Sequence, residues 1–446
     1  MKLLFISLGC DKNLVDSEVM LGLLNRRGYL LTDEEPEADI IIVNTCCFIN
    51  DAKEESINTI LDMAVWKKSG SCKALIVTGC LAERYKQEIL EEIPEVDGIL
   101  GTSSYEEIAD VITECLKEKK HIIRFHNLDY LPQNEEKRMI TTGGHYAFLK
   151  IAEGCDKHCT YCVIPSVRGN YRSIPMARLI KEASDLADMG VKELILVAQE
   201  TTLYGSDLYG KKALPKLLEE LSKIPEIHWI RLQYCYPEEI TKDLIGAIKK
   251  LPKVCHYLDV PIQHASDTIL KRMGRKTDQE QLRSRILLLR QEIPDIVLRT
   301  TLISGFPGEN EEDHEILMDF VDEMEFDRLG VFAYSPEEGT PAASMDIQIA
   351  KELKESRRNE IMELQQEIVF EKCQTMIGRV VEVIIEGKAV EEDVYVGRTY
   401  MDAPNVDGLI FINTDILLVS GDFIKVKVTG ASEYDLIGEV ADEFTK

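Results

Sequence analysis

The chain has 446 residues, of which 45% are hydrophobic and 29% charged, and its formal net charge is −27. This length exceeds that of a usual single domain, so we expect two or three domains with enough apolar mass for packed cores. No stretch approaches eighteen uninterrupted apolar residues, which excludes a membrane-spanning helix and favours a cytoplasmic location. No large segment is basic, so the chain lacks the electrostatic footprint of a nucleic-acid-binding protein.

The first 120 residues alternate short apolar runs with amphipathic stretches. By apolar spacing, we expect strands at 3–7, 39–44, 74–78 and 98–100, and helices at 14–27, 52–65, 83–92 and 105–119. This order predicts an α/β domain over 1–125 with a doubly wound parallel sheet. Residues 126–145 are polar and lack periodicity, which is typical of a linker.

The alternation resumes with a longer repeat over 146–375. Strands are expected at 147–152, 193–198, 229–234, 256–260, 297–303 and 329–334, separated by helices such as 177–189, 279–291 and 312–324. Six such units fall short of the eight in a closed barrel, so we expect an open, partial (β/α)6 barrel. In such folds the chemistry gathers at the carboxyl ends of the strands. A long charged helix over 350–373 then leaves the barrel.

Residues 376–446 have a different character. Five short strands are expected at 380–385, 394–399, 408–413, 423–428 and 436–440, which indicates a small five-stranded β-barrel of the OB-like kind. This segment holds six basic and 14 acidic residues.

Twelve cysteines are many for a compartment that keeps thiols reduced, so metal binding or catalysis is favoured over disulfides. Cys155, Cys159 and Cys162 form a CxxxCxxC run directly after an expected strand. Three thiolates at this spacing can hold three irons of an iron–sulfur cluster and leave the fourth iron open. The alternative is a structural zinc site, which needs four protein ligands and would require His158 to turn inward. We favour the cluster.

Three more cysteines are far apart in the sequence but occupy equivalent positions. Cys10, Cys46 and Cys80 each follow an expected strand of the N-terminal sheet. Because the carboxyl ends of parallel strands line one crevice, these thiols can converge on a second metal site. Any one of them alone would better be explained as a buried thiol. Cys47 could compete with Cys46, but its side chain should point elsewhere.

Other polar and glycine residues at expected strand ends are weaker candidates. Gly305, Pro307 and Gly308 could let backbone approach a nucleoside, and Gln199, Glu200 and Thr201 could line the barrel mouth. For His264 we favour a role as a satisfied core histidine. Asn13, Asp16 and Ser17 either stabilise the loop at Cys10 or cap the following helix, and capping is favoured.

The loop at Cys155 resembles that of the radical S-adenosylmethionine family, including the aromatic Tyr161 before its last cysteine. This resemblance implies a 4Fe-4S cluster whose open iron binds S-adenosylmethionine, with Tyr161 against the adenine. Reductive cleavage would then release a 5′-deoxyadenosyl radical.

Two three-cysteine groups in this order resemble the methylthiotransferases over nearly the whole chain. The supporting segments are 9–18 (GCDKNLVDSE), 43–56 (VNTCCFINDAKEES), 77–80 (VTGC), 257–267 (YLDVPIQHASD), 299–309 (RTTLISGFPGE) and 333–340 (AYSPEEGT). The resemblance implies two 4Fe-4S clusters and a C-terminal barrel called TRAM. One S-adenosylmethionine would methylate sulfur at the second cluster, and another would supply the radical that opens a substrate C–H bond.

The segments 12–18, 197–205 and 396–408 look like the RimO branch, which modifies the β-carbon of an aspartate in the twelfth small-subunit ribosomal protein. An acidic TRAM barrel suits a basic ribosomal protein better than RNA. The resemblance also implies a sulfur donor, an electron donor such as flavodoxin or ferredoxin, and a monomeric enzyme. The alternatives are methylthiolation of adenosine in transfer RNA and, from a different class, a non-catalytic iron–sulfur electron carrier or RNA-binding module. No residue is assigned to orient the substrate.

Overall fold

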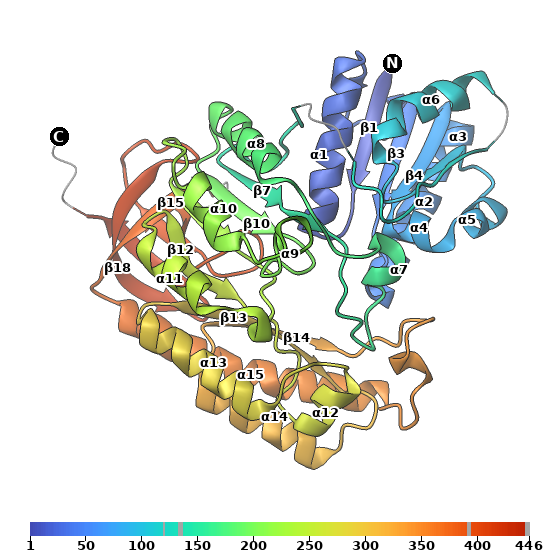
Figure 1. The fold of residues 1–446 in the computed structure, drawn as a ribbon. Helices are drawn as coiled ribbons and strands as arrows, with labels where there is room; N and C mark the ends of the chain where they lie inside the picture. The colour runs from blue at the N-terminus through green and yellow to red at the C-terminus, as the bar shows by residue number, and fades with distance from the viewer. Residues whose placement is uncertain (119–120, 133–136, 390–393, 442–446) are drawn as a thin grey trace.

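Three sheets succeed one another along the chain in the computed structural model, which describes residues 1–118, 121–132, 137–389 and 394–441. An N-terminal six-stranded sheet is followed by a central six-stranded sheet and a closed five-stranded barrel. Figure 1 shows the N-terminal sheet (blue) and the C-terminal barrel (red) on opposite sides of the central sheet (green).

The N-terminal sheet has the strand order β2-β1-β3-β4-β5-β6, and all its pairings are parallel. Its elements are β1 (Lys2–Ser7), α1 (Asp11–Arg26), β2 (Leu30–Leu31), β3 (Ile40–Thr45), α2 (Asn50–Ala64), α3 (Trp66–Ser69), β4 (Ala74–Gly79), α4 (Cys80–Tyr85), α5 (Gln87–Glu92), β5 (Gly98–Leu100), α6 (Ile108–Lys117) and β6 (Ile122–Arg124). The central strands β3 and β4 are buried along their whole length. Their apolar runs therefore need cover on both faces.

Two separate hydrophobic clusters provide that cover. Met20 of α1 and Ile108 of α6 pack on one face of the sheet. Ile60 of α2 and Leu90 of α5 pack on the other. The expected doubly wound parallel sheet is therefore confirmed.

The central sheet is parallel and keeps its strands in chain order, β7-β10-β11-β12-β13-β14. Its elements are β7 (Tyr146–Lys150), β8 (Ala152–Glu153), α7 (Ile164–Arg168), β9 (Arg172–Ser173), α8 (Met176–Asp188), β10 (Glu193–Val197), α9 (Ser206–Tyr209), α10 (Leu214–Leu221), β11 (Trp229–Leu232), α11 (Lys242–Lys250), β12 (Val254–Asp259), α12 (Asp267–Arg272), α13 (Gln279–Glu292), β13 (Val297–Ser304), α14 (Glu311–Met324), β14 (Arg328–Ala333) and α15 (Lys351–Met376). The edge strands β7 and β14 do not pair, so the predicted open, partial barrel is confirmed.

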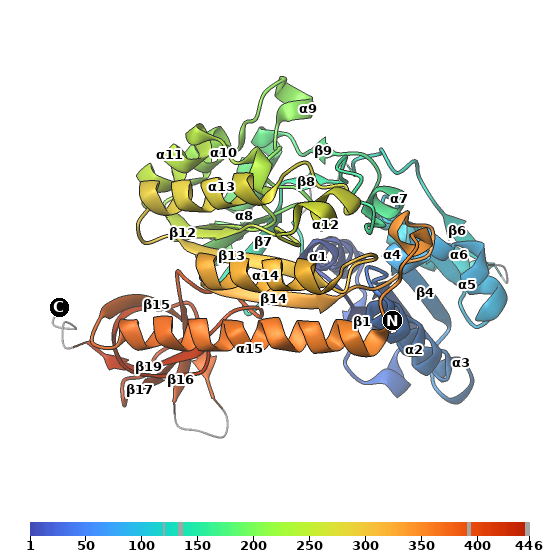
Figure 2. The same ribbon diagram turned by 90° about the horizontal axis from the view of Figure 1, so that it is seen from below.

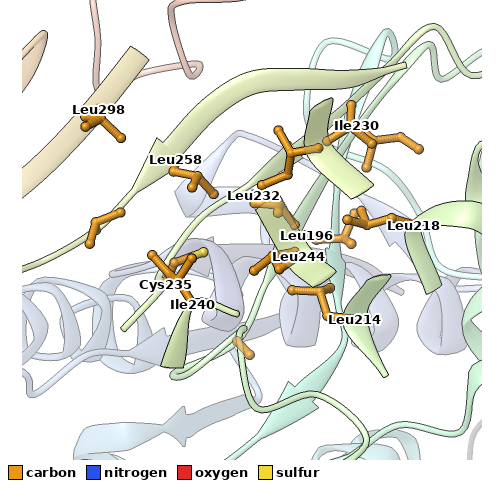
Figure 3. Packing of buried hydrophobic residues seen from close by; sticks show 14 of the residues in the cluster. Leu196, Leu214, Leu218, Ile230, Leu232, Cys235, Ile240, Leu244, Leu258 and Leu298 are labelled. Carbon is orange, nitrogen blue, oxygen red and sulfur yellow. The ribbon is translucent and has the colours of Figure 1, made fainter. Parts of the chain in front are cut away.

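Alternate residues of the central strands pack under the surrounding helices. Figure 3 shows Leu214 and Leu218 of α10 against Leu196 of β10 and Leu232 of β11. The other face of the sheet is covered from two directions. Val15 of α1 packs there with residues of β7 and β10, and the C-terminal barrel packs at the beginnings of β11, β12 and β13.

The C-terminal barrel is closed in the order β15-β16-β17-β19-β18. Its strands are β15 (Val380–Lys388), β16 (Tyr395–Thr399), β17 (Ile410–Asn413), β18 (Phe423–Ser432) and β19 (Asp435–Val440), and they confirm the expected five-stranded barrel. The long helix α15 runs beneath the central sheet and ends at this barrel, where Val369 and Cys373 join the barrel core (Figure 2).

Several elements differ from the sequence expectation. The helix expected at 83–92 is broken at Lys86, whose positive φ of 41° separates α4 from α5. The strands β2 and β6 were not foreseen because each is only two or three residues long. Within the expected linker, residues 126–132 and 137–145 form neither helix nor strand. No helix in the described part of the chain is long and apolar enough to cross a membrane.

A buried ionic group joins the C-terminal barrel to the central sheet. Glu193, the first residue of β10, accepts hydrogen bonds from Arg231 Nε and Arg398 Nη2, each at 2.7 Å. Burial alone would raise the pKa of Glu193, but the charges of Arg398 and Arg231 outweigh it and lower the pKa to about 2. The carboxylate is thus ionised and compensated at neutral pH.

Replacing Glu193 with glutamine is expected to destabilise the protein by about 3–5 kcal/mol, because Arg231 would keep a buried charge without its carboxylate. Urea unfolding followed by fluorescence at neutral pH measures this loss. In the native chain the contribution is present above pH 4.5 and is lost as the pH falls toward 2. Glu220→Gln, at an exposed pair with Lys216 and Lys223, serves as the control and should leave the midpoint unchanged. Equal midpoints for both variants would contradict the prediction.

Candidate functional site

Cys10, Cys46 and Cys80, hereafter the strand-end thiols, lie at one edge of the N-terminal sheet. Cys10 immediately precedes α1, Cys46 follows β3, and Cys80 begins α4 directly after β4. The strands β1, β3 and β4 are neighbours in the sheet and run in parallel, so their carboxyl ends meet. Burial, together with the nearby Cys80 and Cys10, raises the pKa of Cys46 to about 12. The three thiols are thus close enough to influence one another.

Two glycines permit this approach. Gly9 has a φ of +87°, and a Cβ there would lie 2.8 Å from Cys46 Sγ. Gly79 has a φ of +92°, and a Cβ there would lie 2.4 Å from Asn44 Oδ1. A side chain at either position would strain the backbone and displace the strand ends.

Cys47 is placed differently from Cys46. Its side chain is fully buried in the hydrophobic cluster on one face of the N-terminal sheet. Burial raises the pKa of this thiol, Cys80 raises it further, and the guanidinium of Arg84 lowers it. Cys80 and Cys10 both raise the pKa of Cys46, whereas the thiols that raise the pKa of Cys47 are Cys80 and Cys46.

Cys155, Cys159 and Cys162, hereafter the loop thiols, lie on the loop that follows β8. Cys155 N donates to Gly169 O at 3.1 Å, and Cys162 N donates to Cys159 O at 3.1 Å, so the loop folds back on itself. Burial, together with Cys159 and Cys155, raises the pKa of Cys162 to about 12. His158 is exposed, with a positive φ of 51°, and so does not turn inward as the zinc alternative requires.

Tyr161 places the loop thiols beside the segment that follows β13. Its ring contacts the edge of the buried Phe306 ring, with centroids 6.3 Å apart. Phe306 lies between Gly305 and Pro307, so the predicted nucleoside-binding residues Tyr161, Gly305, Pro307 and Gly308 come from adjoining segments. The space for a Cβ at Gly305 is filled by Lys354, and that at Gly308 by Arg272. Both glycines are therefore needed for packing within this chain, and their presence alone does not indicate that a nucleoside binds there.

Glu309 fixes this segment, a role that the sequence analysis missed. Its Oε2 accepts hydrogen bonds from the backbone of Gly305 at 2.8 Å and Phe306 at 3.1 Å. Its Oε1 accepts one from Arg357 Nη1 at 2.9 Å. The buried His264 accepts a hydrogen bond from Ser266 N at Nδ1, and its Nε2 lies 3.4 Å from Glu309 Oε2. His264 is therefore buried as expected, but its Nε2 makes no hydrogen bond with a described residue, so its side chain is only partly satisfied.

A buried polar network joins the two thiol groups, and we call it the bridging network: Asn13, Asp16, Lys150, Glu153, Arg168 and Gln199. Arg168 donates to Asp16 Oδ2 at 2.6 Å, to Asn13 Oδ1 at 3.0 Å and to Glu153 Oε2 at 3.2 Å. Lys150 donates to Glu153 Oε2 at 2.7 Å and also pairs with Asp16. The N-terminal sheet is thus fastened to the mouth of the central barrel by ion pairs.

The capping role favoured for Asn13, Asp16 and Ser17 is wrong, because Cys10 is the N-cap of α1 and makes no side-chain capping bond. Asn13 instead donates to Leu8 O at 2.7 Å, which holds the loop at Cys10. Asp16 faces Arg168. The sequence analysis missed Lys150, Glu153 and Arg168 altogether, because single charged residues in a strand and a short helix leave no periodic signal.

Gln199 and Glu200 carry buried acceptor atoms at the barrel mouth. Gln199 Nε2 donates to Glu153 Oε1 at 2.7 Å, but Gln199 Oε1 has no hydrogen-bond partner in the described part of the chain. Glu200 Oε2 likewise accepts no hydrogen bond from a described residue and has Lys157 Nζ at 4.0 Å. Burial raises the pKa of Glu200 to about 7, although Thr202 and Lys157 lower it in part. Both residues are placed to receive a donor from a ligand.

Backbone strain also gathers at this mouth. Tyr234 and Gln263, which follow β11 and β12, have positive φ values of 60° and 71°. Tyr234 donates from its hydroxyl to Asp11 Oδ1 at 3.1 Å, and Lys12 Nζ lies 3.2 Å from the centre of its ring. Such strained conformations persist where surrounding contacts over-determine them, which is typical of functional sites.

The donor chemistry fits two iron–sulfur clusters. Each group offers three thiols and no fourth cysteine ligand of the same pattern, which leaves one iron of a four-iron cluster open. Within the described ranges, no group of three or more His, Cys, Asp or Glu side chains is arranged to hold a single metal ion. The case for the two clusters therefore rests on the two groups of three thiols. For the strand-end thiols it also rests on their position at neighbouring strand ends and on Gly9 and Gly79, which make room for them.

The chain matches three known sequence families. Residues 2–101 match Uncharacterized protein family UPF0004, residues 149–321 match the Radical SAM superfamily, and residues 377–441 match the TRAM domain.

Full-length relatives carry the name ribosomal protein uS12 methylthiotransferase RimO. The protein of Lachnoclostridium phytofermentans is 64% identical, with 98% of this chain and 99% of the relative covered. That of Acetivibrio thermocellus is 54% identical over 99% of this chain and 98% of the relative. That of Clostridioides difficile is 50% identical over 99% of both.

Solved structures share the fold at low sequence identity. The radical S-adenosylmethionine methyltransferase TsrM from Kitasatospora setae, with cobalamin and a 4Fe-4S cluster bound, has a TM-score of 0.55 at 13% identity. The match covers 76% of this chain and 73% of TsrM. The cobalamin-dependent S-adenosylmethionine radical enzyme OxsB has a TM-score of 0.53 at 13% identity, covering 82% of this chain and 56% of OxsB.

Replacing Cys46 with alanine is expected to halve the iron bound after anaerobic reconstitution, because a strand-end cluster would lose one of its three ligands. Cys47→Ala is the matched control and should retain full iron, since the Cys47 side chain is fully buried and it is Cys46 Sγ that lies against Gly9, beside Cys10. Iron and sulfide analysis of both variants measures the difference. Loss of iron in Cys47→Ala with retention in Cys46→Ala would reverse the ligand assignment.

Replacing Glu200 with glutamine should change how stability depends on pH. The pKa of Glu200 is raised from 4.5 to about 7, so the folded state favours the protonated carboxyl. Its favourable contribution to the free energy of unfolding is therefore fully present below pH 4.5 and is lost as the pH rises through 7. The variant should therefore match the native chain at pH 5 and exceed it at pH 8, by roughly 3 kcal/mol at most. Thermal unfolding at both pH values tests this. A stability difference that is the same at both pH values would contradict the assignment.

Proposed function

This chain belongs to the methylthiotransferases of the RimO type, and on that premise we propose that it attaches a methylthio group to the β-carbon of an aspartate in ribosomal protein uS12. The observation that carries the proposal is the contact between the segments that bear the two groups of thiols: Arg168, which ends the helix just after Cys162, donates a hydrogen bond to Cys80 Sγ at 3.3 Å. The carboxyl edge of the N-terminal sheet is held against the mouth of the central barrel by the bridging network. A methylthiotransferase needs both sites within reach of one substrate atom.

The six cysteines are proposed as the ligands of two 4Fe-4S clusters, Cys10, Cys46 and Cys80 for one and Cys155, Cys159 and Cys162 for the other. When bound, these clusters and S-adenosylmethionine would supply the radical that opens the C–H bond and the methylthio group that fills it.

The chain's own residues would bind and orient the reactants. Tyr161 is proposed to lie against the adenine, beside the backbone of Gly305, Pro307 and Gly308. The unpartnered Gln199 Oε1 and Glu200 Oε2 are proposed to accept hydrogen bonds from bound S-adenosylmethionine. The N-terminal sheet closes the barrel mouth, and exclusion of water there would direct the radical to one bond.

The charge of the C-terminal barrel supports a protein substrate over RNA. Residues 376–446 contain six basic and 14 acidic residues. Buried ion pairs withhold residues of both signs from a partner: Arg398 pairs with Glu193, and the acidic Asp402 and Asp407 pair with Arg328 and Arg299. The excess of acidic residues therefore remains. Phosphate binding requires accessible cations, whereas a lysine- and arginine-rich ribosomal protein is attracted by carboxylates.

The remaining partners follow from the same chemistry. We propose a low-potential electron donor such as flavodoxin or ferredoxin, a separate sulfur donor, and a monomeric enzyme acting in the cytoplasm. The substrate would be uS12, either free or in the small ribosomal subunit.

Mass spectrometry of uS12 and of transfer RNA from a strain lacking this chain tests the proposal. The methylthio group should be missing from the aspartate of uS12, while the methylthiolated adenosine of transfer RNA persists. Complementation with the native chain should restore the uS12 modification, and complementation with a Cys155→Ala, Cys159→Ala, Cys162→Ala variant should not. Unaltered uS12 together with loss of the transfer RNA modification would show that RNA is the substrate.

A further inference from the structure

Arg168 is a buried arginine that lies between the two thiol groups. It ends the short helix α7, which begins two residues after Cys162, and its side chain is 2% exposed. Its Nε donates to Cys80 Sγ at 3.3 Å. A residue carried by the loop-thiol segment thus touches one of the strand-end thiols.

The guanidinium of Arg168 is held by three neighbours. Asp16 and Glu153 accept from Nη1 and Asn13 accepts from Nη2, so the donors on both terminal nitrogens are directed away from Cys80. Because the guanidinium is planar, these bonds also fix the direction of its Nε–H. The hydrogen bond to Cys80 is therefore set by the network and not by rotation of a free side chain.

The helix that carries Arg168 is fixed as well. Val167 packs in the hydrophobic cluster of the N-terminal sheet. Its carbonyl oxygen accepts a hydrogen bond from Thr102 Oγ1 at 2.7 Å. Thus α7 forms a short rigid link from Cys162 to Cys80.

The charges around Arg168 balance before any cluster is counted. Lys150 and Arg168 face Asp16 and Glu153, two cations against two carboxylates, all of them buried. Of the two cations, Arg168 is the one that donates a hydrogen bond to a cysteine sulfur. At the loop thiols, the corresponding contact is a neutral phenol, with Tyr236 Oη 3.5 Å from Cys159 Sγ.

Charge and hydrogen bonds at cluster sulfurs set the reduction potential of an iron–sulfur cluster. A cation stabilises the reduced form, which carries one more negative charge, and the effect is strong where water is excluded. A fixed guanidinium on one thiolate should therefore make that cluster easier to reduce.

We infer that Arg168 is a positioning residue that fixes Cys80 as a cluster ligand and raises the reduction potential of the cluster at the strand-end thiols. The inference rests on the proposed function, because it takes Cys10, Cys46 and Cys80 to hold a cluster. The bridging network would then tune the reduction potential of the strand-end cluster, and it also joins the N-terminal sheet to the central barrel.

Redox titration of the strand-end cluster, followed by electron paramagnetic resonance, tests the inference. The full-length chain with Cys155, Cys159 and Cys162 replaced by alanine isolates this cluster. In that background, Arg168→Gln should shift the midpoint potential to a more negative value, and Arg168→Lys, which keeps the charge, should shift it less. In the complementary background, with Cys10, Cys46 and Cys80 replaced, Arg168→Gln should leave the potential of the other cluster unchanged.

Arg231→Gln is the matched control. Arg231 is also fully buried and paired with a carboxylate, but it lies at the opposite end of the strands, against Glu193 and Tyr400 O. It should lower the unfolding temperature without shifting either potential. A shift of the same size in Arg231→Gln would overturn the inference, as would an unchanged potential in Arg168→Gln.

If Arg168→Gln no longer binds the strand-end cluster, Arg168→Met, which also removes the charge, carries the measurement, and an unchanged potential there overturns the inference. The native chain provides the separate test of the proposed function. Fewer than about eight irons per native chain would contradict the two-cluster proposal itself. If the native chain binds both clusters but substitution of Arg168 leaves the reduction potential of the strand-end cluster unchanged, only the role of Arg168 is contradicted.

Discussion

The ion pairs of Asp16 and Glu153 with Lys150 and Arg168 hold the two thiol-bearing parts of the molecule together. All four side chains are buried, so each charge has been taken out of water at a cost that only its partners offset. Removal of any one would leave an uncompensated charge at the contact between the N-terminal sheet and the barrel. The four ion-paired side chains therefore fix the position of the N-terminal sheet relative to the barrel. In that position, Cys80 lies beside the segment that carries Cys162. The distance between the two thiol groups is a property of this network.

The direction of the strands decides where the rest of the molecule can act. Cys10, Cys46 and Cys80 follow the carboxyl ends of strands in the N-terminal sheet, and the loop with Cys155, Cys159 and Cys162 follows β7 of the central sheet after the short strand β8. The carboxyl ends of parallel strands are where chemistry gathers in such folds. The C-terminal barrel packs at the beginnings of β11, β12 and β13, through residues such as Trp229 and Phe423. The acidic barrel is thereby separated from the thiols by the length of the central strands. A partner held at this barrel would have to extend a segment along the central strands to reach the thiols.

Much of the fold could be predicted from the sequence because apolar runs and their order are local signals. The runs at β3 and β4 are continuous and buried, so they identify a parallel sheet without any tertiary information. The six candidate cysteines are also local signals, because Cys10, Cys46 and Cys80 each follow an apolar run and Cys155, Cys159 and Cys162 share one CxxxCxxC motif; their role as ligands stays a prediction. The contacts that join the domains could not be predicted. Arg168 meets Asp16 across 152 positions of the chain, and nothing in the residues around either one indicates the other. The break at Lys86 was missed for a related reason, since a positive φ at a lysine contradicts its helix propensity.

Two buried oxygens at the barrel mouth, Gln199 Oε1 and Glu200 Oε2, are placed to accept hydrogen bonds from a ligand. A buried oxygen without a hydrogen bond costs about 1–3 kcal/mol, so a ligand that donates to it would be stabilised. Gln199 Oε1 and Glu200 Oε2 both lie in this state as far as the described residues go, and they are adjacent in the chain at the end of β10. The strained Tyr234 stands at the end of the neighbouring strand. A ligand that brings hydrogen-bond donors to this mouth would satisfy both oxygens at once, and the ammonium group of S-adenosylmethionine is such a donor. Hydrogen bonds to these two oxygens would stabilise the bound ligand. They would also fix its orientation at the barrel mouth, beside the bridging network.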